Sequence, residues 1–70
     1  MGQFLLSTVS TLASLTYAKL EAGALEQAHT GIDALAALIP VLDGHVEAET
    51  IRDLRAALAN LQLAYADASS

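Results

Sequence analysis

Two stretches of apolar residues at helical spacing, separated by Asp43-Gly44, constrain the fold of this chain more than any other feature. In the first stretch, apolar residues recur every three or four positions, which places them on one side of a helix with about 3.6 residues per turn. They are Leu25, Ala28, Ile32, Leu35, Ile39 and Leu42. The second stretch repeats this spacing as a two-heptad seam. It consists of Ile51, Leu54, Leu58, Leu61 and Tyr65. The two stretches predict a helical hairpin.

Three features interrupt the apolar pattern of the hairpin. Gly31 lowers the stability of a helix interior by about 1 kcal/mol relative to Ala. Pro40 lacks an N–H group, and its ring clashes with the preceding turn. Because Leu42 continues the stripe, we expect a kink or a loosened last turn at Pro40 and not an earlier helix end. The glycine of Asp43-Gly44 can take the left-handed conformation, which predicts a sharp turn between the two helices.

The segment Gln3–Leu20 carries no charge before Lys19 and also has a helical stripe. The stripe consists of Leu5, Leu6, Val9, Leu12, Ala13, Tyr17 and Leu20, whereas Phe4 and Leu15 fall off it. A signal peptide would need a basic start, and a membrane span would need a sustained apolar run of about 20 residues. We prefer a helix that is buried on several sides in an oligomer. Gly23 predicts its end, and the short loop predicts an antiparallel neighbour.

The hairpin region resembles a short bacterial family known as domain of unknown function 1844. The resemblance is carried by LEQAHTGIDALAALIPVLDGHVEAETIRDLRAALANLQLAY, which is Leu25–Tyr65. The matching positions are Ala28, Ile32, Asp33, Leu35, Leu38, Gly44, Glu49, Leu54, Leu58, Leu61 and Tyr65. The chain departs from the family pattern at Pro40, His45 and Glu47, which affects the expected turn geometry more than the fold. The resemblance implies a helical fold and brings no activity with it.

Composition predicts one small domain, residues 1–70, that is completed by association. The chain has 70 residues, a hydrophobic fraction of 54% and an aromatic fraction of 4%. An Ala- and Leu-rich composition with few aromatics favours helices. A domain this small has too much surface for its volume to bury so many apolar side chains alone. It has no cysteine, so disulfides, thiolate metal sites and thiol catalysis are excluded.

The charge balance excludes some partners. The formal net charge is −5, and Lys19, Arg52 and Arg55 are the basic residues. A nucleic-acid-binding surface needs clustered cations to replace counterions. An anionic membrane surface attracts basic segments for the same reason. We therefore expect no nucleic acid and no membrane among the partners of this chain.

One short motif has the spacing of a metal site. Glu26 and His29 form a Glu-x-x-His pair, whose side chains can reach one metal together, and Asp33 follows one turn later. Glu26 and Asp33 fall on the side opposite the apolar stripe, whereas metals in helical bundles bind in the interior. Short motifs also match by chance. We favour a solvated helix face over a metal site, so we predict no metal and no cofactor.

These observations predict an all-α fold, a small three-helix bundle with helices at about 3–21, 24–42 and 47–66. No arrangement of catalytic residues is visible, so we expect a non-enzymatic cytoplasmic protein that self-associates as a homodimer or higher oligomer and acts as an adaptor or scaffold. The predicted interface residues are Leu5, Val9, Leu12, Tyr17 and Leu63. Two alternatives remain: a small subunit of a larger hetero-complex, and a metal-binding bundle that uses Glu26 and His29.

Overall fold

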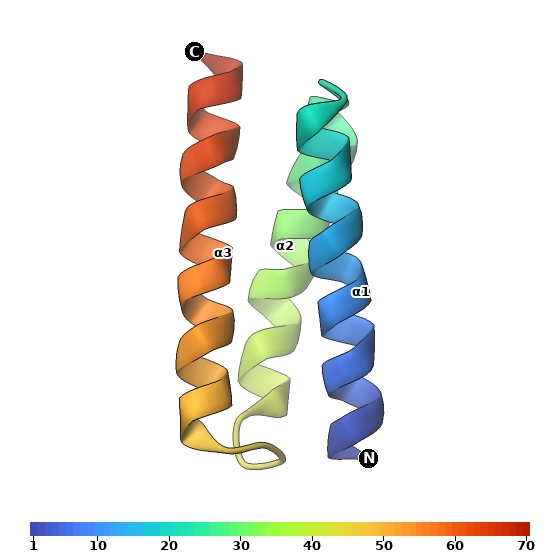
Figure 1. Ribbon diagram of the computed structural model, residues 1–70, viewed down its shortest axis with the longest axis vertical. Coiled ribbons are helices and arrows are strands. Elements are labelled where there is room, and N and C mark those ends of the chain that lie inside the picture. Colours follow the sequence, from blue (N-terminus) through green and yellow to red (C-terminus); the bar gives the residue numbers. More distant parts are fainter.

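Three helices make up almost the whole chain in the computed structural model, which describes residues 1–70 (Figure 1). They are α1 (Gly2–Glu21), α2 (Leu25–Leu42) and α3 (Ala48–Ser69). The helices run up, down and up, so that α1 and α3 point the same way and α2 lies behind both in Figure 1. The bundle measures 36 × 18 × 15 Å. The predicted all-α three-helix bundle is confirmed.

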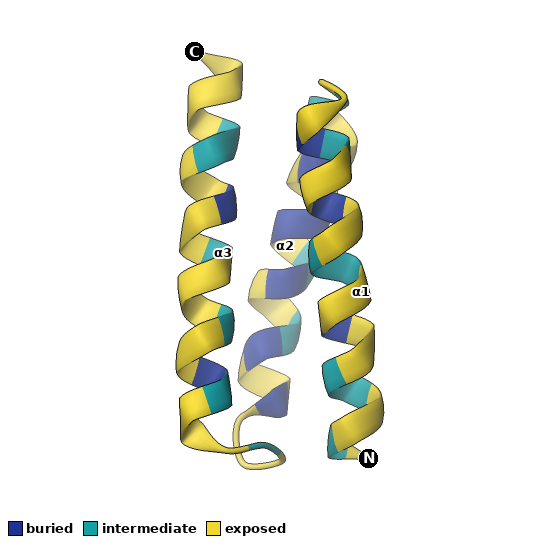
Figure 2. Ribbon diagram, viewed as in Figure 1, coloured by how far each residue is buried: buried dark blue, intermediate teal, exposed yellow.

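The central helix of the bundle is α2, because it holds most of the buried residues (Figure 2) and contacts both of its neighbours. The core consists of Val9, Leu20, Ala28, Ile32, Leu35, Ile39, Leu42, Ile51 and Leu61. Most of these residues belong to α2, as its three- and four-residue spacing predicts. The two core residues of α3 are Ile51 and Leu61. The contact between α1 and α3 is the least extensive of the three helix pairs.

A threonine and a glycine allow α1 to approach α2 closely. Thr16 is 1% exposed, and its Oγ1 donates a hydrogen bond to the carbonyl oxygen of Leu12 at 2.8 Å. That bond satisfies a hydroxyl group that would be costly to bury unpaired. A Cβ atom on Gly31 would overlap Thr16 Oγ1 and lie 3.0 Å from Thr16 Cβ. Gly31 is therefore explained by packing, although it weakens its own helix.

The position of Tyr17 differs from the predicted stripe of α1. Leu5, Leu12 and their apolar neighbours face the core, but Tyr17 is 56% exposed. The buried position next to it is taken by Thr16, because the close approach to Gly31 leaves no room for a ring. Tyr17 lies at the edge between α1 and α3, where the opposing side chains are small. Tyr17 therefore lies at the exposed edge of the predicted stripe, and its assignment to an interface stays a prediction.

Backbone hydrogen bonds close α1 and α2 near the predicted places. Gly23 has φ +77°, and the N–H groups of Gly23 and Ala24 donate to the carbonyls of Leu20 and Lys19 at 3.1 and 2.9 Å. This is the Schellman pattern that glycine favours. The other helix, α2, continues through Pro40 to Leu42. Its last turn is tightened, since Asp43 N–H donates to the Pro40 carbonyl three residues back at 3.2 Å.

The turn between α2 and α3 is of type II. Asp43 has φ −60° and ψ 126°, Gly44 has φ +92°, and His45 N–H donates to the Leu42 carbonyl at 2.8 Å. A type II turn needs a positive φ at its third residue, which glycine adopts without strain. The start of α1 lies against this turn, because a Cβ on Gly2 would come within 2.5 Å of the His45 carbonyl oxygen.

The C-terminal helix is longer than predicted. We expected α3 to end near residue 66, but helical structure continues to Ser69. Two hydroxyl groups bond the last carbonyls: Ser69 Oγ donates to Ala66 O at 3.3 Å, and Ser70 Oγ donates to Asp67 O at 3.0 Å. These bonds satisfy acceptors that a helix end otherwise leaves free.

Candidate interaction surfaces

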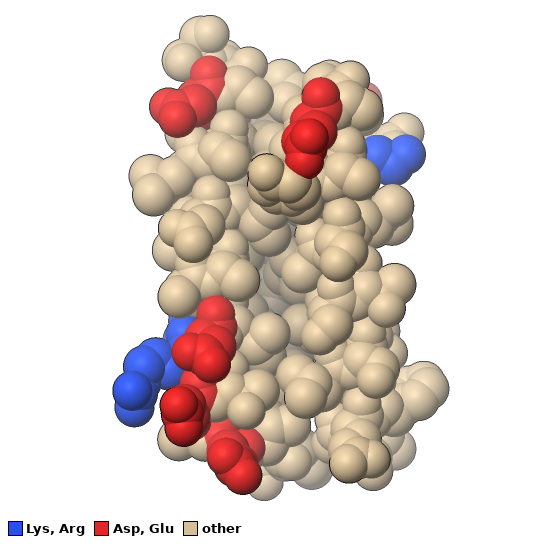
Figure 3. Space-filling model, viewed as in Figure 1, with Lys and Arg blue, Asp and Glu red and all other residues tan.

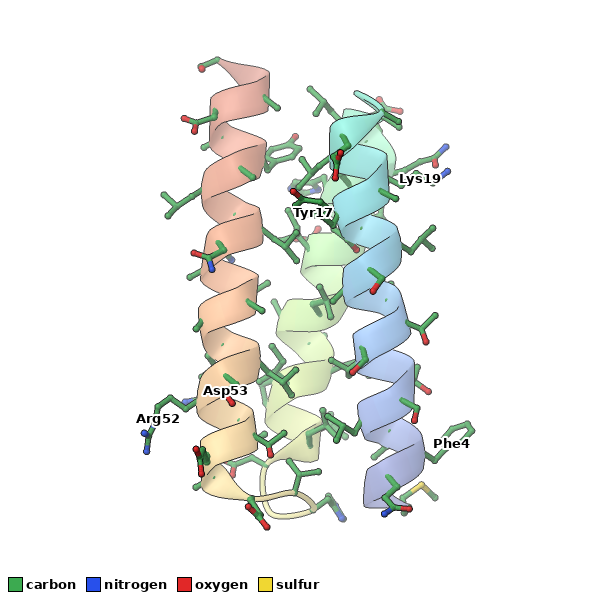
Figure 4. All side chains as sticks on the ribbon, in the orientation of Figure 1. Phe4, Tyr17, Lys19, Arg52 and Asp53 are labelled. Atoms are coloured by element: carbon green, nitrogen blue, oxygen red, sulfur yellow. The ribbon has the colours of Figure 1, made fainter.

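Four residues on the outer side of α1 form a surface row that we call the outer seam: Phe4, Thr8, Thr11 and Leu15. They are spaced four, three and four residues apart, so they lie on one face of the helix. Phe4 is 71% exposed and Leu15 is 53% exposed. Figure 4 shows Phe4 pointing away from α3. The outer seam thus faces away from the groove between α1 and α3.

The surface between the two large residues of the outer seam is hollow. Ser7, Thr8, Thr11 and Leu12 line a depression of about 410 Å³ between Phe4 and Leu15. Thr8 Oγ1 donates to the Phe4 carbonyl oxygen at 3.0 Å, so this hydroxyl is already paired within the helix. A partner that covers Thr8 would therefore not strand an unpaired donor. The outer seam combines two projecting apolar side chains with a shallow floor of small ones.

A second surface, the α1–α3 groove, lies between the two helices that have the least mutual contact. It is lined by Ala13, Ser14 and Tyr17 of α1 and by Ala57, Asn60, Leu61 and Ala64 of α3. Its volume is about 440 Å³, and Figure 3 shows the hollow at the centre of the molecule. Tyr17 points toward it in Figure 4. Ala13 and Ser14 of α1 and the two alanines of α3 are small, and they leave room there for side chains from another molecule.

Charge is absent from both of these surfaces. The residues of the outer seam and of the groove are all uncharged. In Figure 3, acidic side chains gather toward the two ends of the molecule and leave the middle uncharged. The first charged side chain along α1 is Lys19. Because no charged group has to be desolvated, these surfaces can contact another uncharged surface at low cost.

The five predicted interface residues fall in three different environments. Val9 is 1% exposed within the single chain, so it packs in the core and offers no surface to a partner. Leu5 and Leu12 are half-buried against the same core. Tyr17 and Leu63 are exposed, Tyr17 beside the groove and Leu63 on the outer side of α3. A charge at Val9 would therefore disrupt the fold itself and could not report on assembly.

Phe4 and Leu15 were not among the predicted interface residues. They were correctly placed off the inward stripe, and the structure leaves both of them exposed. The sequence did carry a signal for them, because their spacing to Thr8 and Thr11 is itself helical. A search for apolar residues at helical spacing overlooks this row, because two of its four residues are threonines.

The metal candidates occupy an exposed face of α2. His29 Nδ1 lies 3.3 Å from Asp33 Oδ2, one turn along the same helix. The His29 ring also lies against Tyr65 of α3, with ring centroids 5.4 Å apart and a tilt of 51°. Glu26 is exposed, as predicted. Nowhere in the structure do three His, Asp or Glu side chains converge as metal ligands would. In this arrangement His29 links α2 to the end of α3.

Comparison with protein-family models, with curated proteins and with solved structures finds no match to this chain. The resemblance of Leu25–Tyr65 to the domain of unknown function 1844 therefore stays a prediction. None of the three helices combines the length and the apolarity that a membrane crossing requires.

Proposed function

We propose that this chain is a non-catalytic helical module that self-associates as a homodimer or higher oligomer and serves as an adaptor or scaffold in the cytoplasm. One observation carries the proposal. The helix α1 has no charged side chain before Lys19, yet only its inner side is covered by α2 and α3. A helix that is uncharged all round is normally buried on more than one side.

The distribution of exposed apolar residues supports an intermolecular role for α1. The exposed large hydrophobic residues are Met1, Phe4, Leu15, Tyr17, Val41 and Leu63. Most of them belong to α1 or precede it directly. Single exposed apolar residues are common on protein surfaces, whereas a concentration on one element indicates a contact surface.

The exposed area of the single chain also supports association. Its accessible surface is 4545 Å² for a mass of 7.3 kDa. A compact monomer of that mass has about 4,200 Å² by the usual scaling of surface with mass. Only 11 of the 70 residues are buried in the single chain. A partner would remove part of this surplus from water.

A hetero-complex is the second candidate, and the α1–α3 groove favours it. Grooves between helices that expose small apolar side chains accept amphipathic helices of other proteins. In that case the purified chain would stay monomeric and would bind only its partner. The metal-binding alternative uses Glu26 and His29, with Asp33 one turn away, and a second chain would have to supply further ligands, because no three such side chains converge in the single chain.

The experiment is light-scattering mass of the purified chain, with elemental analysis of the same peak. Self-association predicts a metal-free species of at least twice the chain mass of 7.3 kDa. A folded monomer at all accessible concentrations would refute self-association and favour the hetero-complex. Stoichiometric iron, manganese or zinc that is lost in His29→Ala would establish the metal-binding alternative.

A further inference from the structure

We infer that the outer seam of α1 is a homodimer interface in which α1 pairs antiparallel with α1 of a second copy, so that Phe4 of each chain contacts Leu15 of the other. This inference rests on the proposed self-association and specifies the surface and the geometry. The partner is a second copy of this chain, and the α1–α3 groove is left free.

The order of residues along the outer seam makes it complementary to itself. Its spacing of four, three and four residues is the same in both directions, with a large residue at each end and threonines between. A two-fold axis midway between Thr8 and Thr11 therefore places Phe4 opposite Leu15 and Thr8 opposite Thr11. Such a contact is closed, because the same patch serves both partners.

The side-chain sizes fit this register. Small residues at the crossing point let two helix axes come to about 8 Å, the short end of the usual range. The projecting residues of one copy would then lie beside those of the other, where they cover the hollow between Phe4 and Leu15. Both are more than half exposed in the single chain, so the contact would remove apolar surface that nothing else covers.

The charges favour an antiparallel over a parallel pair. Each chain has a net charge of −5, so two copies repel unless their acidic residues face away from one another. The outer seam is the uncharged side of α1, and Lys19 lies one turn beyond Leu15. A parallel pair would bring the two Lys19 side chains together, whereas an antiparallel pair places them at opposite ends. Antiparallel helices also place opposite dipole ends side by side.

The area of this contact sets the expected affinity. Stable interfaces bury about 800 Å² on each partner. One helix of 20 residues is about 30 Å long, and a contact along one of its faces is smaller than that standard. We therefore expect a reversible dimer with a dissociation constant in the micromolar range, on the order of 1–100 μM.

Light-scattering mass at matched concentrations tests whether the outer seam forms the dimer interface, and circular dichroism checks that each variant is folded. Leu15→Lys should halve the mass of the wild-type dimer. Val41→Lys is the matched control, because Val41 is 55% exposed, close to the 53% of Leu15, and belongs to another helix. It should leave the mass unchanged. If Leu15→Lys remains dimeric while Ala57→Lys becomes monomeric, the groove is the interface and the inference is wrong, although self-association stands. A wild type that stays monomeric well above about 100 μM refutes both.

Disulfide trapping tests the orientation. The chain has no cysteine, so the Phe4→Cys and Leu15→Cys single variants each carry one thiol. In a mixture of the two variants, the antiparallel pair places the thiol at position 4 of one chain beside the thiol at position 15 of the other, and Leu15 and Phe4 still meet at the other end of the pair. We expect a covalent dimer in the mixture and none in either variant alone, because equal positions of the two chains lie about 16 Å apart, far beyond disulfide reach. A covalent dimer in each variant alone would show a parallel pair and overturn the inference. A Val41→Cys variant, oxidised under the same conditions, measures random cross-linking.

Discussion

At the scale of single residues, the contact between Thr16 and Gly31 decides how closely α1 and α2 approach. Neither residue is apolar in the usual sense, yet both are buried. The Thr16 hydroxyl bonds to the Leu12 carbonyl, and both the hydroxyl and the methyl group of Thr16 lie close to Gly31 of α2. The glycine that weakens the interior of α2 thus permits the most extensive helix contact in the bundle.

We predict that Gly31→Ala destabilises the protein, although alanine is the better helix former. The propensity gain is about 1 kcal/mol, whereas overpacking costs about 1–3 kcal/mol, and the new Cβ would overlap Thr16 Oγ1. We expect a net loss of up to about 2 kcal/mol in the free energy of unfolding, measured by urea denaturation at one protein concentration.

A double-mutant cycle gives the control for this prediction. In a Thr16→Ala background the overlapping hydroxyl and the methyl group are gone, so Gly31→Ala should cost at least about 1 kcal/mol less than in the wild type. Ala37→Gly, on the exposed side of α2, measures the propensity difference alone. Equal costs of Gly31→Ala in both backgrounds would mean that the two helices do not meet at this contact.

At the scale of elements, the sequence predicted the three helices with small errors at their ends. Gly23 and Gly44 both take positive φ angles, as their positions between apolar stripes indicated. Periodicity placed Tyr17 on the stripe of α1 but did not show that Thr16 is the buried residue, because Gly31, which admits the threonine, belongs to another helix. It also ended α3 too early, since serine hydroxyls at a chain end bond carbonyls in a way that periodicity does not reveal.

The candidate surfaces were less predictable than the helices. The sequence showed that α1 carries no charge before Lys19, and from this we predicted that α1 contacts a partner. Which side of α1 stays open depends on the packing of α1 against α2. Val9 illustrates the limit, because its apolarity suits an interface and a core equally well, and only the fold assigns it to the core.

The turn between α2 and α3 yields a prediction at the same scale. Gly44 has φ +92° and no atom within 4 Å of the position a Cβ would take, so any cost of Gly44→Ala comes from the backbone. A left-handed conformation costs most residues about 1–2 kcal/mol. We expect Gly44→Ala to lower the melting temperature by roughly 7–14 °C at a fixed concentration.

Gly44→Asn is the control for the turn, because asparagine tolerates positive φ better than alanine does. It should lower the melting temperature by less than alanine does. Thermal denaturation followed by circular dichroism measures both variants. If alanine and asparagine leave the melting temperature at the wild-type value, the turn does not need a left-handed residue at this position.

At the scale of the whole molecule, stability and association are linked. A core of nine buried apolar residues in a 70-residue chain supplies no more than about 3–5 kcal/mol by itself. Covering the outer seam of α1 would add apolar burial that the single chain lacks. The stability of the folded, dimeric state should therefore increase with protein concentration, as it does for any native state that is stabilised by binding.

The melting temperature gives the measure of this linkage. If a native dimer unfolds to two separate chains, each tenfold rise in concentration adds about 1.4 kcal/mol to its stability. The unfolding entropy of two 70-residue chains is about 0.3 kcal/mol/K, so the melting temperature should rise by about 4–5 °C per tenfold step above the dissociation constant. Leu15→Lys should remove this dependence, and Val41→Lys should keep it. A wild-type melting temperature that stays constant over a hundredfold range of concentration would count against self-association. The melting temperature of a native dimer that unfolds to separate chains must rise with concentration by mass action.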